Sequence, residues 1–460
     1  MEKWLLSDIA RYFGAKLPID AEIENICTDT RAITPNSLFV ALEGERFDGH
    51  NFVTEAFQKG AVAAICHKPI EATDKPVIMV KNTQRALITL GCAYRLKYNI
   101  PMVAVTGSVG KTTTKEMIAC VLGSCLKTLK TEGNLNNEIG LPLTLLRLDK
   151  SYECAVIEMG MTHKGELSVL TAATLPSVAV ITNIGVSHIE NLGSRENILS
   201  AKLEITEGLP AGGSLVLNYD DDLLCDIKDY CGFDIISYSI INSHAKVRAL
   251  NIRETADETA FDISYKNNLY PACIPCVGRH NILNALAAFS TAVALKLDLH
   301  KGTEALKQYT PAGMRQRVVH KSGITVIEDC YNASPDSMRA ALATLQTLKK
   351  NGRSIAVLAD MLELGDYSRK AHEGVGQMVG ESGTDILITY GEKAEYIAGA
   401  ANRAGIEQVY SFGDKHAAGE KLLALAQKDD IILFKGSRGM KLEEMMEQFY
   451  AGLADSTNLR

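Results

Sequence analysis

The last third of the chain alternates short apolar runs with segments in which apolar side chains recur every three or four positions. The runs have the length of buried strands and lie at residues 324–328, 355–358, 386–389, 409–412 and 431–434. The segments between them have helical spacing and lie at residues 338–348, 394–404, 417–426 and 442–450. This alternation predicts an α/β fold in which helices wind doubly around a parallel sheet, as in Rossmann-like domains.

The earlier residues follow the same pattern in two further blocks. The first block predicts helices and strands at residues 5–13, 37–42, 52–60, 61–66 and 77–80. The second predicts helices at 86–98, from 115 onward, at 195–208 and at 282–294. Its predicted strands lie at 102–105, 154–157, 177–183 and 215–218, with alternating β-structure over 246–277. We therefore expect three α/β domains, at residues 1–82, 83–312 and 313–460.

The stretch Met102–Thr114 reads MVAVTGSVGKTTT, an order of strand, glycine loop and helix start that suits phosphate binding. Gly107 and Gly110 lack Cβ atoms, so backbone N–H groups can surround phosphate oxygens, and a helix N-terminus adds partial positive charge. In such a loop Lys111 reaches the β- and γ-phosphates and Thr112 offers its hydroxyl to Mg²⁺. The predicted nucleotide-binding residues are Gly107, Ser108, Val109, Gly110, Lys111, Thr112 and Thr113. The central domain is thus expected to be a P-loop, ATPase-like parallel sheet.

This loop departs from the general pattern at one position, because Val105 stands where the first glycine is expected. The alternative interpretation is a structural glycine turn between a buried strand and a helix. Lys111 and Thr112 directly after the second glycine favour phosphate binding, since a turn alone does not require them.

Polar side chains follow several of the predicted strands. Glu158 comes directly after the run at 154–157, His188 follows the run at 177–183, and Asp329 and Asn332 follow the run at 324–328. Ligands bind at the carboxyl ends of strands in open parallel sheets, so these side chains are candidates for a common site. Glu158 lies where a metal ligand or a water-positioning group belongs, whereas His188 is explained about as well by a structural role.

Two sets of asparagines have open interpretations. Asn134, Asn136 and Asn137 lie beside glycines, and either a loop or an amide-rich surface for a polar substrate accounts for them. Asn281 and Asn284 are three residues apart at the start of a predicted helix. That spacing suits contacts to a base or a ribose, although a helix N-cap explains Asn281 as well.

Two polar clusters in the first block, Thr28–Arg31 and Asp48–His50, are typical of turns or helix caps as much as of binding sites. Lys202 lies in a predicted helix, where a lysine is ordinarily a solvated charge. Cys273 and Cys276 have the spacing of half a zinc site, but the sequence has no accompanying pair, and two strand residues facing the core explain them better.

Composition narrows the class of protein. The 460 residues carry a net charge of −7 without a basic cluster, which argues against a nucleic-acid motor. The sequence has no apolar stretch long enough to span a membrane, and Glu2 and Asp8 in its first residues are atypical of a signal peptide. The 11 cysteines are dispersed, as in reduced cytosolic proteins. We therefore expect a cytoplasmic monomer that binds small molecules, without nucleic-acid or membrane partners.

Seven motifs, in order along the chain, resemble those of the Mur ligases, the ATP-dependent amide ligases that build the peptidoglycan precursor. They are T-G-S-V-G-K-T-T at 106–113, G-N-L-N-N-E-I-G at 133–140, I-E-M-G at 157–160, N-I-G-V-S-H at 183–188, A-K at 201–202, G-R-H-N-I-L-N at 278–284 and D-C-Y-N-A-S-P-D-S-M at 329–338. The resemblance covers essentially the whole chain, and the order of the motifs makes it specific.

Within the family, residues 329–338 and 359–365 most resemble the members that attach D-alanyl-D-alanine to UDP-N-acetylmuramoyl-tripeptide. The ligase of the preceding step often carries a D-N-P-R motif, which this sequence lacks. The alternatives are a sister ligase that adds the third amino acid, a folate polyglutamate ligase and, from a different class, a P-loop regulatory NTPase. A folate ligase has no need of a UDP-binding domain, and a GTPase should show N-K-x-D, which is absent.

The resemblance implies a mechanism in which a substrate carboxylate attacks the ATP γ-phosphate, and the dipeptide amine then displaces phosphate from the acyl phosphate. It implies ATP and two Mg²⁺ ions, with metal ligands at Thr112, Glu158, His188 and a carbamylated Lys202. It implies catalytic roles for Lys111, Lys202, His188 and Arg315. The implied ATP contacts include His280, Asn281, Asn284, Arg315, Asp329 and Asn332, with Arg317 as a rival to Arg315. Substrate contacts are implied or expected at Thr28, Asp29, Thr30, Arg31, Asp48, His50, Asn134, Asn136 and Asn137.

Overall fold

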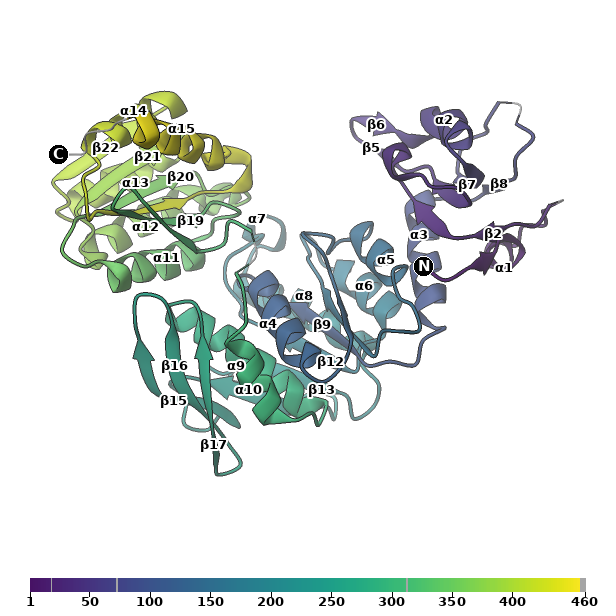
Figure 1. Cartoon of the computed structure of the whole chain (residues 1–460), viewed down its shortest axis with the longest axis horizontal. Helices are drawn as coiled ribbons and strands as arrows, with labels where there is room; N and C mark the ends of the chain where they lie inside the picture. The colour runs from purple at the N-terminus through teal and green to yellow at the C-terminus, as the bar shows by residue number, and fades with distance from the viewer. Residues whose placement is uncertain (18, 72, 312, 456–460) are drawn as a thin grey trace.

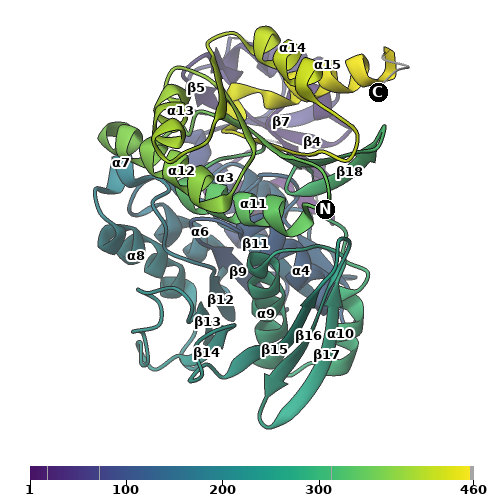
Figure 2. The same ribbon diagram turned by 90° about the vertical axis from the view of Figure 1, so that its left-hand side faces the viewer.

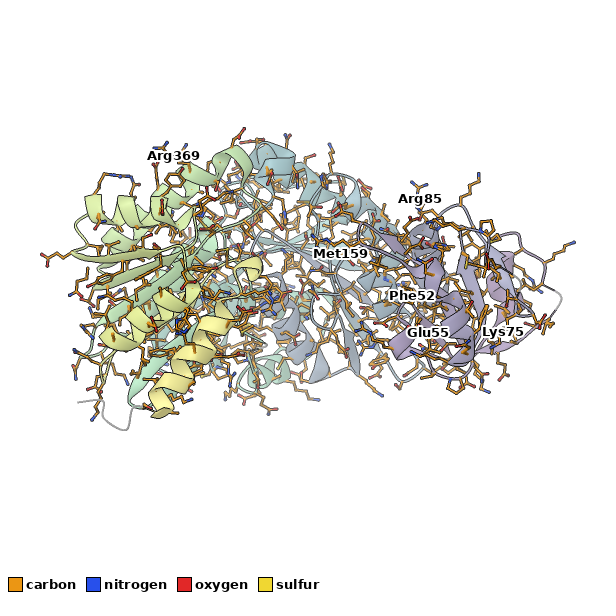
Figure 3. All side chains as sticks on the ribbon, turned by 90° about the horizontal axis from the view of Figure 1, so that it is seen from above. Phe52, Glu55, Lys75, Arg85, Met159 and Arg369 are labelled. Carbon is orange, nitrogen blue, oxygen red and sulfur yellow. The ribbon has the colours of Figure 1, made fainter. Side chains whose placement is uncertain are left out.

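The computed structural model describes residues 1–17, 19–71, 73–311 and 313–455. Positions 18, 72, 312 and 456–460, which the predicted domain ranges include, lie outside the described residues. The larger sheets follow one another in a row, from the amino-terminal sheet through the central sheet to the carboxy-terminal sheet (Figure 1). Figure 3 shows the same row from above. Arg369 lies at the carboxy-terminal end, Met159 between the ends, and Phe52, Glu55 and Lys75 at the amino-terminal end.

The amino-terminal sheet is parallel and has the strand order β3-β4-β7-β8. Its strands are β3 (Asn25–Cys27), β4 (Ser37–Val40), β7 (Ala61–Cys66) and β8 (Val77–Met79). The accompanying elements are α1 (Leu6–Arg11), α2 (Val53–Gln58) and the short antiparallel pairs β1 (Trp4–Leu5) with β2 (Glu22–Ile23) and β5 (Glu43–Gly44) with β6 (Phe47–Asp48). Short 3₁₀ turns cover Thr30–Ala32 and Gly49–Phe52.

The central sheet has the strand order β10-β11-β9-β12-β13-β14-β15-β16-β17. It is parallel from β10 to β15, and β15, β16 and β17 form an antiparallel extension. The parallel strands are β9 (Met102–Thr106), β10 (Thr128–Lys130), β11 (Cys154–Glu158), β12 (Val178–Ile181), β13 (Ser214–Asn218) and β14 (Asp234–Ser239). The extension comprises β15 (Val247–Glu254), β16 (Thr259–Tyr265) and β17 (Asn268–Ile274).

Helices cover both faces of the central sheet because its inner strands are apolar on both faces. On β9, Ala104 joins the core under one layer of helices, while Val103 and Val105 join the core under the other. The first layer contains α3 (Thr83–Arg95), α5 (Gly140–Leu145) and α6 (Glu166–Thr174). The second contains α4 (Lys111–Gly123), α9 (Arg279–Ala294) and α10 (Leu299–Leu306) (Figure 2). The helices α7 (Ile189–Leu192) and α8 (Arg195–Leu203) follow β12.

The carboxy-terminal sheet has the order β18-β19-β23-β20-β21-β22 and is parallel except for the pair β18–β19. Its strands are β18 (Arg317–Lys321), β19 (Ile324–Asp329), β20 (Ser354–Ala359), β21 (Ile386–Tyr390), β22 (Gln408–Phe412) and β23 (Ile431–Lys435). The helices α11 (Pro335–Leu348), α12 (Ser368–Ser382) and α13 (Ala394–Arg403) cover one face, and α14 (Lys415–Leu425) and α15 (Leu442–Asp455) cover the other. The predicted α/β, doubly wound class is confirmed.

Several element predictions need correction. The antiparallel edge strand β18 was not predicted, and the predicted helix at 195–208 is α8 followed by a 3₁₀ segment at Glu204–Gly208. The helix α12 was also missed, because its glycines weaken the helical signal. A Cβ on Gly376 would lie 2.3 Å from the carbonyl oxygen of Ile397 on α13. Close packing against α13 therefore explains this glycine and stabilises the helix.

The described helices are also informative about membranes. Among them, not one is both long enough and apolar enough to cross a lipid bilayer.

Candidate active site

A cavity of about 810 Å³ lies between the central and carboxy-terminal sheets, on the side where their parallel strands end. Its walls include the glycine loop at 108–113, the asparagine segment at 134–139, the start of α9 and the residues that follow β19. This location is where open parallel sheets bind ligands. The cavity thus brings together side chains that are far apart in the sequence.

The glycine loop has the backbone that the sequence predicted. Gly107 has a φ of 151° and Gly110 a φ of 81°, so both residues lie in conformations that favour glycine. A Cβ on Gly107 would also lie 1.8 Å from Oγ1 of Thr182. Helix α4 begins at Lys111 rather than at 115, so the loop is one turn closer to the helix N-terminus than predicted. The free N–H groups of that turn border the cavity, as an anion site requires.

The strand β12 leads into the residues that hold the loop in place. The backbone N–H of Val109 donates to Oδ1 of Asn183 at 2.9 Å, and the Asn183 amide donates to the Val109 carbonyl at 3.1 Å. The N–H of Gly185 donates to the Ser108 hydroxyl at 2.8 Å. These bonds fix the loop to the neighbouring strand end before any ligand binds.

Lys111 folds back over its own loop. Its Nζ donates to the carbonyl of Gly107 at 2.8 Å, and burial lowers the pKa of the ammonium, with Glu158 acting in the opposite direction. When an anion binds in the cavity, it can take the place of the Gly107 carbonyl as the partner of the Lys111 ammonium.

Glu158 ends β11 and is buried, with both carboxylate oxygens in hydrogen bonds. Thr112 donates its hydroxyl to Oε2 at 2.8 Å, and the Asn136 amide donates to Oε1 at 2.8 Å. Lys115 lies behind it, fully buried, with its Nζ 4.0 Å from Oε2 and 2.8 Å from Glu116. A hydroxyl and a carboxylate at the edge of the glycine loop suit a hard divalent cation. The three asparagines whose interpretation the sequence left open, Asn134, Asn136 and Asn137, all line the cavity.

Among the described residues, no three His, Cys, Asp or Glu side chains come together as a preformed metal site. This finding is compatible with the predicted ligands, because they also comprise the hydroxyl of Thr112 and a modified lysine. Mg²⁺ also keeps several waters and takes oxygens from bound phosphates, so it needs few protein ligands. The pair Cys273 and Cys276 joins no such group either.

His188 lies after β12 and faces Glu363 from the carboxy-terminal sheet. Its Nδ1 is 3.1 Å from Oε2 of Glu363, and both residues line the cavity. His188 and Lys111 hold the pKa of the Glu363 carboxyl below its usual value. The sequence reasoning identified His188 but missed Glu363, whose position three residues after Asp360 and four after the end of β20 offered a weak signal.

Lys202 is buried in α8, with 1% of its surface exposed, and it is not among the residues that line the cavity. Burial lowers its pKa well below the usual value, and the charge of Lys111 lowers it further. Within the described residues, no carboxylate lies at ion-pair distance to offset this burial. The prediction of a solvated surface charge was wrong.

Helix α9 presents His280, Asn281 and Asn284 to the cavity. Gly278 is the N-cap residue, so Asn281 lies inside the helix, and its side chain donates to the Val277 carbonyl at 2.8 Å. The capping interpretation was therefore wrong. Asn284 accepts from the Thr114 hydroxyl at 2.9 Å, which joins α9 to α4. Burial lowers the pKa of His280, whose Nε2 is 2.6 Å from Oε1 of Gln316.

The carboxy-terminal sheet contributes a buried ion pair and a stacked arginine. Lys435, at the end of β23, donates to Oδ2 of Asp329 at 2.7 Å and to the carbonyl of Asn332 at 3.2 Å. Arg315 stacks its guanidinium over the ring of Tyr331 at 3.9 Å and lines the cavity. Its rival Arg317 lies on β18, is exposed and pairs with Glu328 at 3.5 Å, away from the cavity lining. Lys435 and Tyr331 were not among the predicted site residues.

The predicted residues near the amino-terminal sheet lie outside this cavity lining. Asp29 accepts from Arg31 in an exposed pair, next to Thr28 and Thr30. Asp48 pairs with Nδ1 of His50 at 2.6 Å and with Lys68 at 2.6 Å. The backbone N–H of His67 donates to Nε2 of His50 at 3.1 Å, so Nδ1 carries the proton in that ring. These side chains support local structure, and their role toward a substrate stays a prediction.

The parts of the chain that carry the central and the carboxy-terminal sheets meet near the cavity, where Gly185 lies against α11. A Cβ on Gly185 would lie 2.2 Å from Oδ2 of Asp336, a buried oxygen without a hydrogen-bond partner among the described residues. Gly185 has no positive φ, so its backbone tolerates other residues. The missing side chain at Gly185 therefore serves the approach of the carboxy-terminal sheet.

Comparison with known proteins gives matches along the chain. Residues 22–95 match the model of the Mur ligase family catalytic domain, 105–292 the Mur ligase middle domain, and 314–438 the Mur ligase glutamate ligase domain. The UDP-N-acetylmuramoyl-tripeptide–D-alanyl-D-alanine ligase of Bacillus subtilis is 39% identical, over 92% of this chain and 93% of its own. The ligase of that name from Escherichia coli is 36% identical, over 94% of each chain.

Two solved structures agree with these matches. The crystal structure of MurF from Acinetobacter baumannii has a TM-score of 0.91 and 33% identity, and covers 98% of this chain and 99% of its own. The MurF ligase of Thermotoga maritima, solved in complex with ADP, has a TM-score of 0.84 and 27% identity, and covers 94% of this chain and 98% of its own.

We expect Gly185→Ala to weaken the contact between the two sheets, because the added methyl group forces the Asp336 carboxylate to move. Small-angle X-ray scattering should then show a larger radius of gyration than for the unchanged protein. The double variant Gly185→Ala/Asp336→Ala removes the colliding carboxylate and should return the radius to its original value. An unchanged radius in the single variant would contradict the assignment of Gly185 as the contact.

Proposed function

The chain belongs to the Mur ligase family, and from this we infer that it is the ATP-dependent ligase that joins D-alanyl-D-alanine to UDP-N-acetylmuramoyl-tripeptide. The observation that carries this inference is a phosphate-binding loop in a cavity that a second parallel sheet closes. The curated relatives with 36–39% identity, which align over more than nine-tenths of the chain, are named for this activity. The enzyme forms an amide bond in peptidoglycan precursor synthesis.

The nucleotide binds in the cavity with its phosphates on the glycine loop. The loop's N–H groups and the N-terminus of α4 receive the phosphate oxygens, and Lys111 turns from the Gly107 carbonyl to the γ-phosphate. We propose base or ribose contacts for His280, Asn281 and Asn284, which α9 presents to the same cavity. Asp329, Asn332 and Arg315 approach from the other sheet.

We propose two Mg²⁺ ions, with Thr112 and Glu158 as ligands of the first, His188 as a ligand of the second, and carbamylated Lys202 as a further oxygen ligand. The oxygen donors of Thr112 and Glu158 already meet at the edge of the loop, which suits a hard cation. The metal would neutralise the negative charge that accumulates when a carboxylate approaches a polyphosphate. Lys202 fits a modified lysine, because a buried amine with a lowered pKa is more often uncharged, and the uncharged form reacts with carbon dioxide.

The protein's own groups then place the reactants. Lys111 stabilises the γ-phosphate charge while the tripeptide carboxylate attacks the γ-phosphorus. The bond from that phosphorus to the bridging oxygen breaks, ADP leaves, and an acyl phosphate is formed. The dipeptide amine attacks the acyl carbon next, and phosphate leaves. The contact of the two sheets keeps water from this intermediate, which would otherwise hydrolyse.

The remaining proposals concern organisation. We propose that residues 1–82 bind the UDP part of the substrate through Thr28–Arg31 and Asp48–His50, with Asn134, Asn136 and Asn137 along its path. We propose that residues 83–312 bind ATP and that residues 313–460 bind the dipeptide and close over the nucleotide. We further propose a monomer in the cytoplasm. All 11 cysteines are free, which suits a reducing compartment.

The test of the function is phosphate release from ATP with UDP-N-acetylmuramoyl-tripeptide, measured with and without D-alanyl-D-alanine. We expect release to require the dipeptide and to match a gain in mass of the nucleotide substrate. Parallel assays with lysine and diaminopimelate as the third peptide residue identify the accepted tripeptide. Release that responds to a single amino acid would move the enzyme to the preceding step, and release without any acceptor would favour a regulatory NTPase.

Lys111→Ala should lower dipeptide-dependent phosphate release by about 10³-fold or more, because one preorganised charge toward a developing anion is lost. The comparison with Lys111→Arg separates charge from geometry, since arginine keeps the charge and changes the reach. Circular dichroism should show an unchanged fold in both variants. Near-normal turnover of Lys111→Ala would remove the loop from the mechanism.

Lys202→Ala should lose most activity and regain part of it when short carboxylic acids such as acetate or propionate are added. A small carboxylate can replace the oxygen ligands that the carbamate supplies. Chloride at the same concentration is the salt control, and Lys228→Ala, which removes an exposed lysine from the segment between β13 and β14, should behave as the unchanged enzyme. Full activity of Lys202→Ala without rescue would refute carbamylation.

A further inference from the structure

Two residues with left-handed backbones face each other where the carboxy-terminal sheet meets the central one. His188 has a φ of 64° and Glu363 a φ of 62°, and neither is a glycine. Such conformations are sparsely populated by residues with side chains, and they persist where the surrounding structure enforces them. Their side chains meet, with Nδ1 of His188 at 3.1 Å from Oε2 of Glu363. The contact is thus formed by two residues whose backbones both adopt an uncommon conformation.

The carboxylate of Glu363 is the polar group that lies next to Nδ1 of His188. Nδ1 of His188 is buried and has no aligned hydrogen bond within the described residues, so the carboxylate at 3.1 Å is its available partner. In proteins without bound substrate such contacts are often misaligned and become aligned in the loaded complex. The side chain of His188 is 18% exposed, whereas that of Glu363 is 63% exposed within the cavity wall.

The loop that carries Glu363 is anchored on both sides. The N–H of Met361 donates to Nε2 of the buried His372 at 3.0 Å, and the N–H of Leu362 donates to the Ser437 hydroxyl at 2.9 Å. On the other side, Gly365 lies against Glu190, since a Cβ there would be 2.9 Å from Cγ of that residue. The carboxylate is thus presented to His188 by a rigid support rather than by a free loop.

We propose that Glu363 is a positioning residue that orients the ring of His188 across the interface, so that Nε2 is the nitrogen directed to the reacting phosphates. A carboxylate that accepts from Nδ1–H fixes both the ring orientation and the tautomer, which is how ligating histidines are commonly held. The proposal rests on the function proposed above, and it assigns the orientation of the His188 ring to Glu363.

Glu363 follows β20 of the carboxy-terminal sheet, so its contact with His188 joins two separate sheets. His188 belongs to the central sheet, so its ring acquires the oriented form when the other sheet docks. The approach of the carboxy-terminal sheet therefore completes the arrangement around the phosphates, which couples closure to catalytic competence.

Steady-state kinetics of Glu363→Ala and Glu363→Gln test the proposal. Glu363→Ala should lower kcat by about 10- to 100-fold, the usual effect of losing the partner of a ligating histidine, with KM for ATP and for the dipeptide nearly unchanged. Glu363→Gln should recover most of the loss, because its amide oxygen accepts from the same Nδ1–H. Asp366→Ala is the matched control, since Asp366 is an exposed acid of the same loop outside the cavity lining, and it should have no effect.

A double-mutant cycle separates orientation of His188 from a general effect on docking. In a His188→Ala background, Glu363→Ala should cause no further loss of kcat, because the ring that it orients is absent. Equal losses of kcat from Glu363→Ala with and without His188 would overturn the proposal, as would an Ala variant with the kcat of the unchanged enzyme.

A binding measurement gives a readout that does not depend on turnover. Electron paramagnetic resonance can count Mn²⁺ bound in the presence of a non-hydrolysable ATP analogue. Glu363→Ala should weaken Mn²⁺ binding about 10-fold and Asp366→Ala should leave it unchanged. Identical Mn²⁺ affinity in all three proteins would overturn the proposal. If the unchanged enzyme releases no dipeptide-dependent phosphate, the proposed function fails instead, and the two failures are thereby distinguishable.

Discussion

The structure depends on the charge of the phosphates that its cavity is built to receive. A carboxylate must approach a polyphosphate, and the repulsion between them is the main barrier that the protein has to reduce. The central sheet supplies the glycine loop, the N-terminus of α4 and Lys111, and the other sheet brings Arg315. Neither sheet holds the whole set, so under the proposed function their contact would be a condition of the chemistry.

Three buried lysines show how differently the fold treats the same side chain. Lys115 lies beside Glu116 and Glu158, and Lys435 lies beside Asp329, so each of these two lysines has a carboxylate partner. Lys202 is as deeply buried, but it has no carboxylate at ion-pair distance within the described residues. An unpaired buried ammonium is costly, and it favours either the uncharged amine or a chemical change that supplies an acid. The first two lysines thus have partners, whereas the third is the lysine for which modification is proposed.

The contact of the two sheets is specified by small features at one edge. Gly185 leaves room for Asp336, Gly365 leaves room for Glu190, and Glu363 meets His188. Each feature is minor alone, yet all lie in the three segments that follow β12, β19 and β20, at the carboxyl ends of their sheets. Parallel topology gathers them there, because every such strand ends at the same edge.

The sequence by itself determined the α/β class, the parallel strands of the carboxy-terminal sheet, the phosphate loop and the family. These depend on local patterns, since apolar periodicity, glycines that free the backbone and ordered motifs are all written along the chain. It did not reveal α12, because the glycines that lower its helical propensity are explained by packing against α13. Nor did it distinguish Arg315 from Arg317, which are two residues apart, or show that Lys202 is buried without a partner. Those outcomes, and the meeting of His188 with Glu363, arise from contacts between residues far apart in the chain, which only the tertiary structure decides.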